Sequence, residues 1–149
     1  MNEILDKLDR ENLKIASFAK RFVAYVIDCF ILSVIVCIVF FEQMSNAKDP
    51  NDLVLIINNI SLGFVLLQFV YHLIFTFLYG ASLGKIFCKI AIVDELSLDK
   101  PNFIQSAIRS GVRQLSDMAF ALGFFWALGN DLRKTWHDYA AKTLVIELA

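Results

Sequence analysis

The stretch that decides the fold is FVAYVIDCFILSVIVCIVFF, from Phe22 to Phe41, which contains a single charged side chain, Asp28. A helix rises about 1.5 Å per residue, so these twenty residues are long enough to cross a hydrocarbon core about 30 Å thick. The stretch therefore predicts a transmembrane helix over 22–41. The apolar run that ends at Tyr79 predicts a second transmembrane helix over 59–79.

The composition of the whole chain also indicates a membrane protein. Hydrophobic residues make up 58% of the 149 residues, charged residues 19%, and the mean hydropathy is +0.60. A typical soluble domain is only about 45–50% apolar. The lipid bilayer is therefore the expected partner, and the length suits one domain over 1–149. A net charge of −1 gives no reason to expect nucleic acid as a partner.

The segment 1–21 is expected to be an amphipathic helix on the membrane surface. Apolar residues recur there at nearly helical spacing among charges: Ile4, Leu5, Leu8, Ile15 and Phe18. The same charges leave no room for the apolar core of a signal peptide before the first span, so we expect an uncleaved amino terminus.

A third apolar segment, 115–129, admits two interpretations. It follows a predicted amphipathic helix over 102–114, and its uncharged core from Met118 to Gly129 is only twelve residues long. A segment this short favours a re-entrant hairpin over a full crossing. The alternative is that the helix beginning at Asn102 continues through Gly129 and crosses the membrane at a tilt.

Two short segments rich in β-branched residues predict a small strand pair. They are Ile90 to Val93 and Thr143 to Ile146. Pairing requires both segments on the same side of the membrane, which agrees with a re-entrant 115–129. The tail 130–149 would then be cytoplasmic.

The distribution of lysine and arginine predicts the orientation. Five basic residues precede the first span, only Lys48 lies between the spans, and many follow the second. Because basic residues accumulate in short cytoplasmic loops, the amino terminus of this multi-pass protein is expected in the cytoplasm.

Asp28 is a candidate functional residue because a carboxylate inside a span costs roughly 2.5–3.5 kcal/mol on insertion scales. It needs a partner or a proton, and the candidate partners are Arg21, Arg109 and Arg113. One interpretation is an intramembrane cation or proton site. The other is a structural ion pair that locks one helix to another.

The second span carries a polar row that should face protein and not lipid. Its members recur at intervals of seven, four and four residues: Ser61, Gln68, His72 and Thr76. His72 is a candidate proton acceptor. Alternatively, the row forms hydrogen bonds between helices.

No motif for an enzyme, cofactor or metal is recognisable. GASLGK at 80–85 is one residue too short for a phosphate-binding loop, so no nucleotide is expected. Gly80 and Gly84 are instead expected to allow a sharp exit from the membrane, with Lys85 among the lipid headgroups. Trp136-His137-Asp138 lacks a Ser or Cys nucleophile in a recognisable context. We therefore expect no enzymatic activity, no cofactor and no metal.

The motifs together resemble the RDD family of bacterial membrane proteins, named for one arginine and two aspartates. Arg21 to Asp28 resembles its opening motif, GASLGK with Ile92-Val93-Asp94 its central segment, Arg109 the basic position of its later helix, and His137 to Thr143 with Val145 its closing motif. The resemblance extends from about Ala16 to Ile146. Asp138 would be the second aspartate. Ile86 and Lys89 depart from the family pattern, in which a basic residue and a glycine are frequent.

The resemblance implies a protein of the bacterial inner membrane, and transport or ion exchange has been suggested for some members. The expected fold is an all-α membrane domain with two transmembrane helices, the third apolar segment and a cytoplasmic two-stranded β pair. The leading hypothesis is transport-related cation or proton handling, with Asp28 carrying the exchangeable charge. So few spans enclose a pathway only in a homo-oligomer. The alternative is a non-catalytic scaffold that docks another membrane protein.

Overall fold

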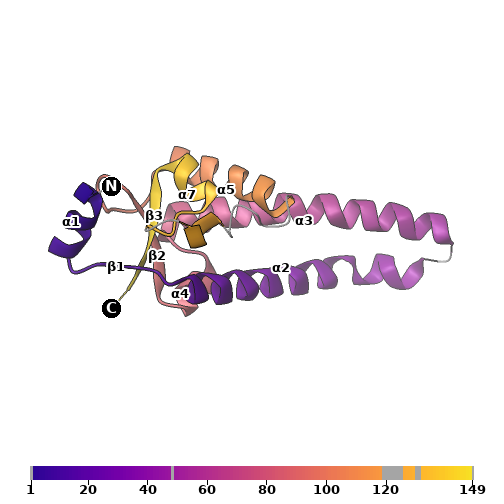
Figure 1. Ribbon diagram of the computed structural model, residues 1–149. Helices are drawn as coiled ribbons and strands as arrows, with labels where there is room; N and C mark the ends of the chain where they lie inside the picture. The colour runs from indigo at the N-terminus through magenta and orange to yellow at the C-terminus, as the bar shows by residue number, and fades with distance from the viewer. Residues whose placement is uncertain (1, 48, 119–125, 130–131, 149) are drawn as a thin grey trace.

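Two long antiparallel helices, α2 (Phe18–Asn46) and α3 (Pro50–Tyr79), dominate the computed structural model, which describes residues 2–47, 49–118, 126–129 and 132–148 (Figure 1). Both are long and apolar enough to cross a membrane. They extend beyond the predicted spans 22–41 and 59–79. Ser17 caps α2 by accepting a hydrogen bond from the Lys20 amide, and Pro50 occupies the first turn of α3. These end signals set the helix bounds, whereas hydropathy marked only the apolar middles.

Among the described residues, three strands form an antiparallel sheet in the order β1-β3-β2. Their bounds are β1 Lys14–Ile15, β2 Ile90–Asp94 and β3 Thr143–Glu147. The predicted pairing of β2 with β3 is confirmed, with Ile92 opposite Val145. The expectation of a two-stranded pair is corrected, because β1 adds a strand on the other side of β3.

The amino-terminal segment differs from the membrane-surface helix expected over 1–21. Helix α1 (Asn2–Arg10) ends well before the first span and is followed by β1. The apolar face of α1 packs on the sheet, where Leu8 is buried with Val93 and Ile146, and Ile4 and Leu5 lie against them. The physical reason is that an apolar sheet face needs a cover, and the amphipathic face of α1 provides it.

Four shorter helices complete the fold: α4 (Leu83–Phe87), α5 (Phe103–Met118), η1 (Trp126–Gly129) and α7 (Trp136–Ala141). Helix α5 packs between α3 and α7, while α4 packs on α2. All four lie at or near the end of the α2–α3 pair that carries the sheet, called the sheet end from here on (Figure 1).

The predicted third apolar segment, 115–129, lies partly outside the described residues, at 119–125. Its first residues belong to α5, which is longer than the predicted 102–114. Helix α5 starts with Phe103 against Phe77, and its Gln114 side chain donates to the Val65 carbonyl, so it runs antiparallel to α3. After the gaps, Leu132 packs against the apolar face of the sheet. The choice between a re-entrant and a crossing segment stays a prediction.

Candidate functional site

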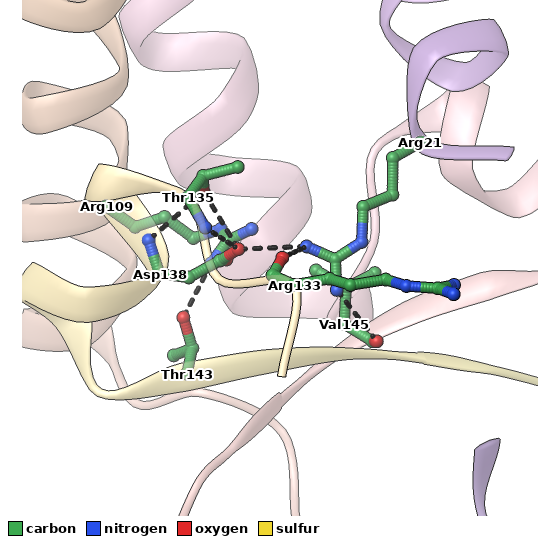
Figure 2. A network of polar contacts seen from close by, with 7 residues as sticks. All are labelled: Arg21, Arg109, Arg133, Thr135, Asp138, Thr143 and Val145. Carbon is green, nitrogen blue, oxygen red and sulfur yellow. Dashed lines mark hydrogen bonds and ion pairs between the residues drawn. The ribbon is translucent and has the colours of Figure 1, made fainter. Parts of the chain in front are cut away.

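The arginine and the two aspartates of the sequence motif are Arg21, Asp28 and Asp138, and they do not form one group. Arg21 and Arg109 both bind Asp138, as Figure 2 shows. Arg21 Nη1 lies 3.0 Å from Asp138 Oδ2, and Arg109 Nη1 forms an ion pair with Asp138 Oδ1. Asp138 is fully buried and each arginine is 4% exposed. This network ties α2, α5 and α7 together.

The backbone of the sheet end completes this network. Arg21 also donates to the Arg133 carbonyl at 2.6 Å and to the Val145 carbonyl at 3.2 Å, while Arg109 donates to Thr143 Oγ1 at 2.6 Å (Figure 2). Two guanidinium groups therefore satisfy one carboxylate and several oxygens of the carboxyl-terminal segment. Burial is tolerable for such charges when they are paired and hydrogen-bonded.

Asp138 is held in place by the start of α7. Thr135 is the N-cap: its hydroxyl and its amide donate to Asp138 Oδ2 at 2.8 and 2.9 Å, and the Asp138 amide donates back to Thr135 Oγ1 at 3.4 Å. This reciprocal arrangement is a capping box. Burial alone would raise the pKa of the Asp138 carboxyl, but the charges of Arg109 and Arg21 outweigh it and hold that pKa far below its usual value.

Asp28 has neutral partners, so the predicted ion pair with Arg21, Arg109 or Arg113 does not form. Its carboxylate accepts hydrogen bonds from the Tyr71 hydroxyl at 2.8 Å, the Ser82 hydroxyl at 2.6 Å and the Gly84 amide at 2.8 Å. It is 1% exposed, in agreement with the expectation that it requires compensation. Its local role is to anchor the start of α4 against α2 and α3.

The GASLGK segment, 80–85, makes this contact sterically possible. Gly80 ends α3 with φ of 66°, in the left-handed region that glycine adopts without strain. A Cβ atom on Gly84 would lie 2.2 Å from the Ala24 carbonyl oxygen, so the backbones of α4 and α2 touch directly. Gly80 thus provides a sharp turn at the end of α3, and Gly84 allows the close approach of α4 to α2.

Most of the polar row of α3 faces protein, as predicted. Gln68, His72 and Thr76 are buried, and Gln68 Nε2 donates to Asp117 Oδ2 on α5 at 2.9 Å. Ser61 is the exception and is exposed, with its hydroxyl donating to the Ile57 carbonyl of its own helix. Ser61 is exposed because α5 covers only the sheet-end half of α3 (Figure 1).

A small cavity of about 30 Å³ lies where these helices meet. Its charged lining includes both Asp28 and the Asp138 network. The basic members are Arg21, Lys85, Arg109 and Arg113, and the acidic members are Asp28, Asp117 and Asp138. A cavity of this volume accommodates about two water molecules.

Lys85 lines this cavity and does not extend to the lipid headgroups as expected. Its side chain is 7% exposed, because α4 packs on α2 with Lys85 turned toward α5 and α7. Burial lowers the pKa of its ammonium group well below the usual value, and the charges of Arg109 and Arg113 lower it further. No ion pair joins Lys85 to a carboxylate among the described residues.

His137 faces the same cavity. Burial lowers the pKa of its imidazole well below the usual value, with Arg109 contributing in the same direction. Its Nδ1 atom has no hydrogen-bond partner in the described part of the chain. Lys85 and His137 are thus titratable groups kept toward their neutral forms in a small polar space.

Comparison with known proteins assigns the family. A model of the RDD family matches residues 15–142, nearly the whole chain. The protein belongs to the RDD family. An uncharacterized protein of Rickettsia prowazekii (strain Madrid E) is 31% identical to this RDD protein over 77 residues, which is 52% of this chain and 42% of the relative. The match thus spans less than half of the relative's length, and no solved structure matches the chain.

The sequence alone did not reveal several residues of this RDD protein's site. The Thr135-x-x-Asp138 spacing is a readable capping signal, and it would have placed Asp138 at a helix start. Tyr71 and Ser82 carry no comparable signal, because they reach Asp28 across 43 and 54 residues of sequence. Asp117 lies four residues after Arg113, a spacing that predicts their ion pair at 3.8 Å.

Proposed function

We propose that this RDD protein handles protons across the bacterial cytoplasmic membrane, with Lys85 as the group that exchanges the proton. It would be a multi-pass transport-related protein without enzymatic activity, its amino terminus in the cytoplasm. The observation that carries the proposal is a buried lysine that has no carboxylate partner among the described residues and faces a water-sized polar cavity at the sheet end of two membrane-length helices.

Lysine suits this role because burial shifts its pKa readily, whereas arginine stays charged. The pKa of Lys85 is lowered, so the loss of its proton requires a less alkaline pH than for a lysine in water. The groups that face it come from each packed element: Arg21 and Asp28 of α2, His72 of α3, Arg109, Arg113 and Asp117 of α5, and His137 and Asp138 of α7. The positive charges oppose protonation of Lys85, and Asp28 and Asp138 favour it.

Asp28 takes a different part from the one expected of it. Three donors already satisfy its carboxylate, so a fixed negative charge beside the cavity is its simplest role. In the proposal Asp28 stabilises the protonated form of Lys85 and holds α4 in place. The exchangeable charge therefore moves from Asp28 to Lys85.

The arrangement of the elements supports the proposed orientation. Helix α2 leaves the sheet end and α3 returns to it, and the described residues that precede α2 or follow α3 belong to one compact region (Figure 1). Most lysines and arginines of the chain lie in that region, which suits the cytoplasmic side. The position of Leu132 against the sheet also favours a re-entrant 115–129.

Proton flux into vesicles tests the proposal. Purified protein is reconstituted into liposomes that enclose a pH-sensitive dye, and a pH gradient is imposed. We expect acidification of the lumen that is lost in Lys85→Met and retained in Lys100→Met, an exposed lysine outside the cavity. Flux no faster than that of empty liposomes would contradict the proposal, as would full flux in a folded Lys85→Met protein.

A homo-oligomer is part of this proposal, because two spans do not surround a continuous pathway. The exposed apolar side chains along α2 and α3 provide the surface for contact with lipid or with another copy. Light scattering of the detergent-solubilised protein would give the mass of the protein component. A strictly monomeric mass in a preparation that shows full flux after reconstitution into liposomes would contradict this part.

The second candidate function is a scaffold that docks another membrane protein. It is favoured by the buried network around Asp138, since such a network fixes helix positions whether or not an ion moves. Asp28→Asn and His72→Ala separate the two candidates. Loss of stability without change in flux supports the scaffold, whereas lost flux in a well-folded variant supports transport.

A further inference from the structure

We infer that the cavity at the sheet end binds one small monovalent anion, of about the size of chloride, between Lys85 and Arg113. This deepens the proposed function by naming an ion class for the same site. It rests on that proposal only for movement of the ion, because binding is measured separately.

The charge balance of the lining favours an anion. Asp138 is shared by two arginines, Asp117 pairs with Arg113 at 3.8 Å and accepts from Gln68, and Asp28 accepts three neutral donors. Among the described residues, no carboxylate of the cavity lining is left to pair with Lys85. A buried ammonium group without a counter-charge is costly, and an anion in the cavity would remove that cost.

The unsatisfied hydrogen-bond donors favour the same ligand. Arg113 is 7% exposed, and its Nε and Nη2 atoms have no hydrogen-bond partner among the described residues. The Arg21 Nε atom likewise has no hydrogen-bond partner among the described residues. An arginine has only donors, so its partner must be an acceptor, which a metal cation or an ammonium ion is not. With Lys85 protonated, four basic and three acidic side chains line the cavity, so its net charge is positive and opposes a cation.

The volume limits the size of the anion. About 30 Å³ is the space of roughly two water molecules, so a single halide fits in place of them. Sulfate, phosphate esters and organic carboxylates are larger than this space. Chloride is the abundant anion of suitable size, and bromide serves as a heavier probe.

Thermal unfolding of the full-length protein in detergent tests for the anion. Melting is compared in sodium chloride, sodium bromide and sodium gluconate at equal ionic strength, because a ligand that binds only the folded state raises the melting temperature. We expect a saturable increase with chloride and bromide and none with gluconate, whose anion is too large for the cavity. Equal melting temperatures in chloride and gluconate would overturn the inference.

Variants locate the effect. Lys85→Met and Arg113→Gln should each weaken the apparent chloride affinity at least tenfold, while Lys100→Met should leave it unchanged. Arg113→Gln keeps the test decisive if Lys85→Met does not fold. A chloride effect of full size in Arg113→Gln would overturn the inference, as would an effect that follows an exchange of sodium for potassium at constant chloride.

The two proposals fail in distinguishable ways. Saturable stabilisation by chloride in detergent, together with no proton flux in liposomes, contradicts the proposed function and leaves the anion site standing. Proton flux without any stabilisation by chloride or bromide contradicts the anion site and leaves the proposed function standing.

Discussion

At the scale of single residues, the decisive feature is that Asp138 forms ion pairs with two arginines, whereas Asp28 forms none with an arginine. Sequence reasoning identified Asp28 because a carboxylate is costly inside a span, and the resemblance to the RDD family added Asp138. It could not assign their partners. Arg21 and Asp138 are separated by 117 residues, and only the folded sheet end brings them to 3.0 Å. Arg21, Arg109 and Arg113 were only candidate partners of Asp28, and neutral donors bind its carboxylate instead.

The Asp138 network predicts a large loss of stability for Asp138→Asn. The variant keeps the shape of the side chain but leaves the buried guanidinium groups of Arg21 and Arg109 without their carboxylate. Removal of one partner from a buried ion pair costs about 3–5 kcal/mol. Urea denaturation in detergent micelles would measure the free energy of unfolding. Asp99→Asn, at an exposed aspartate, is the matched control, and equal stability of the two variants would contradict the prediction.

Lys85 predicts how stability depends on pH. Because its pKa is lowered in the folded protein, the unfolded chain binds more protons between that pKa and 10.5, the ordinary value. The free energy of unfolding should therefore rise with pH in this window, by at most about 1.4 kcal/mol per pH unit from this group. Lys85→Met should remove this rise and Lys100→Met should keep it. Measurement in gluconate separates the effect from anion binding, and parallel curves for both variants would refute the assignment.

At the scale of elements, the helices were predictable and the strand at residues 14–15 was not. The apolar middles of α2 and α3 and the amphipathic α5 follow directly from composition and periodicity. Strand β1 is two residues long, and its identity depends on pairing of Lys14 with Glu147 at the other end of the chain. The position of α1 was not predictable either, because its amphipathic pattern fits a membrane surface and a sheet face equally well. The sheet that α1 covers forms from segments far apart in the sequence.

The contact between α4 and α2 predicts that Gly84→Ala is destabilising. The new methyl group would meet the Ala24 carbonyl at 2.2 Å and the Asp28 carboxylate at 2.9 Å, and neither group is free to move. Overpacking of this kind costs about 1–3 kcal/mol. Gly111→Ala in α5 is the matched control, since its nearest neighbour is the Phe69 ring at 4.0 Å and alanine favours helix. Thermal melting should drop for the first variant only, and unchanged melting of Gly84→Ala would contradict the contact.

At the scale of the whole molecule, the sheet fixes the relation between the two ends of the chain. Residues 14–15 pair with 146–147, so the segments before α2 and after α7 lie together at the sheet end. The sequence supported this only through its basic residues and a predicted strand pair. The path of 115–129 was open at the sequence level, because twelve uncharged residues suit both a short hairpin and a tilted crossing.

Reporter fusions therefore make a sharp prediction about topology. Green fluorescent protein, which matures in the cytoplasm, should fluoresce when fused after Leu148 and before Asn2. Alkaline phosphatase, which is active outside the cytoplasm, should be active only when inserted in the connection at 47–49. An even number of crossings is needed for this outcome, because β1 and β3 form one ladder. Active phosphatase at the carboxyl end, with fluorescence at the amino end, would require a crossing at 115–129. The sheet could then not form in the membrane, and the cavity between α2, α5 and α7 would lose the walls on which the proton and anion proposals depend.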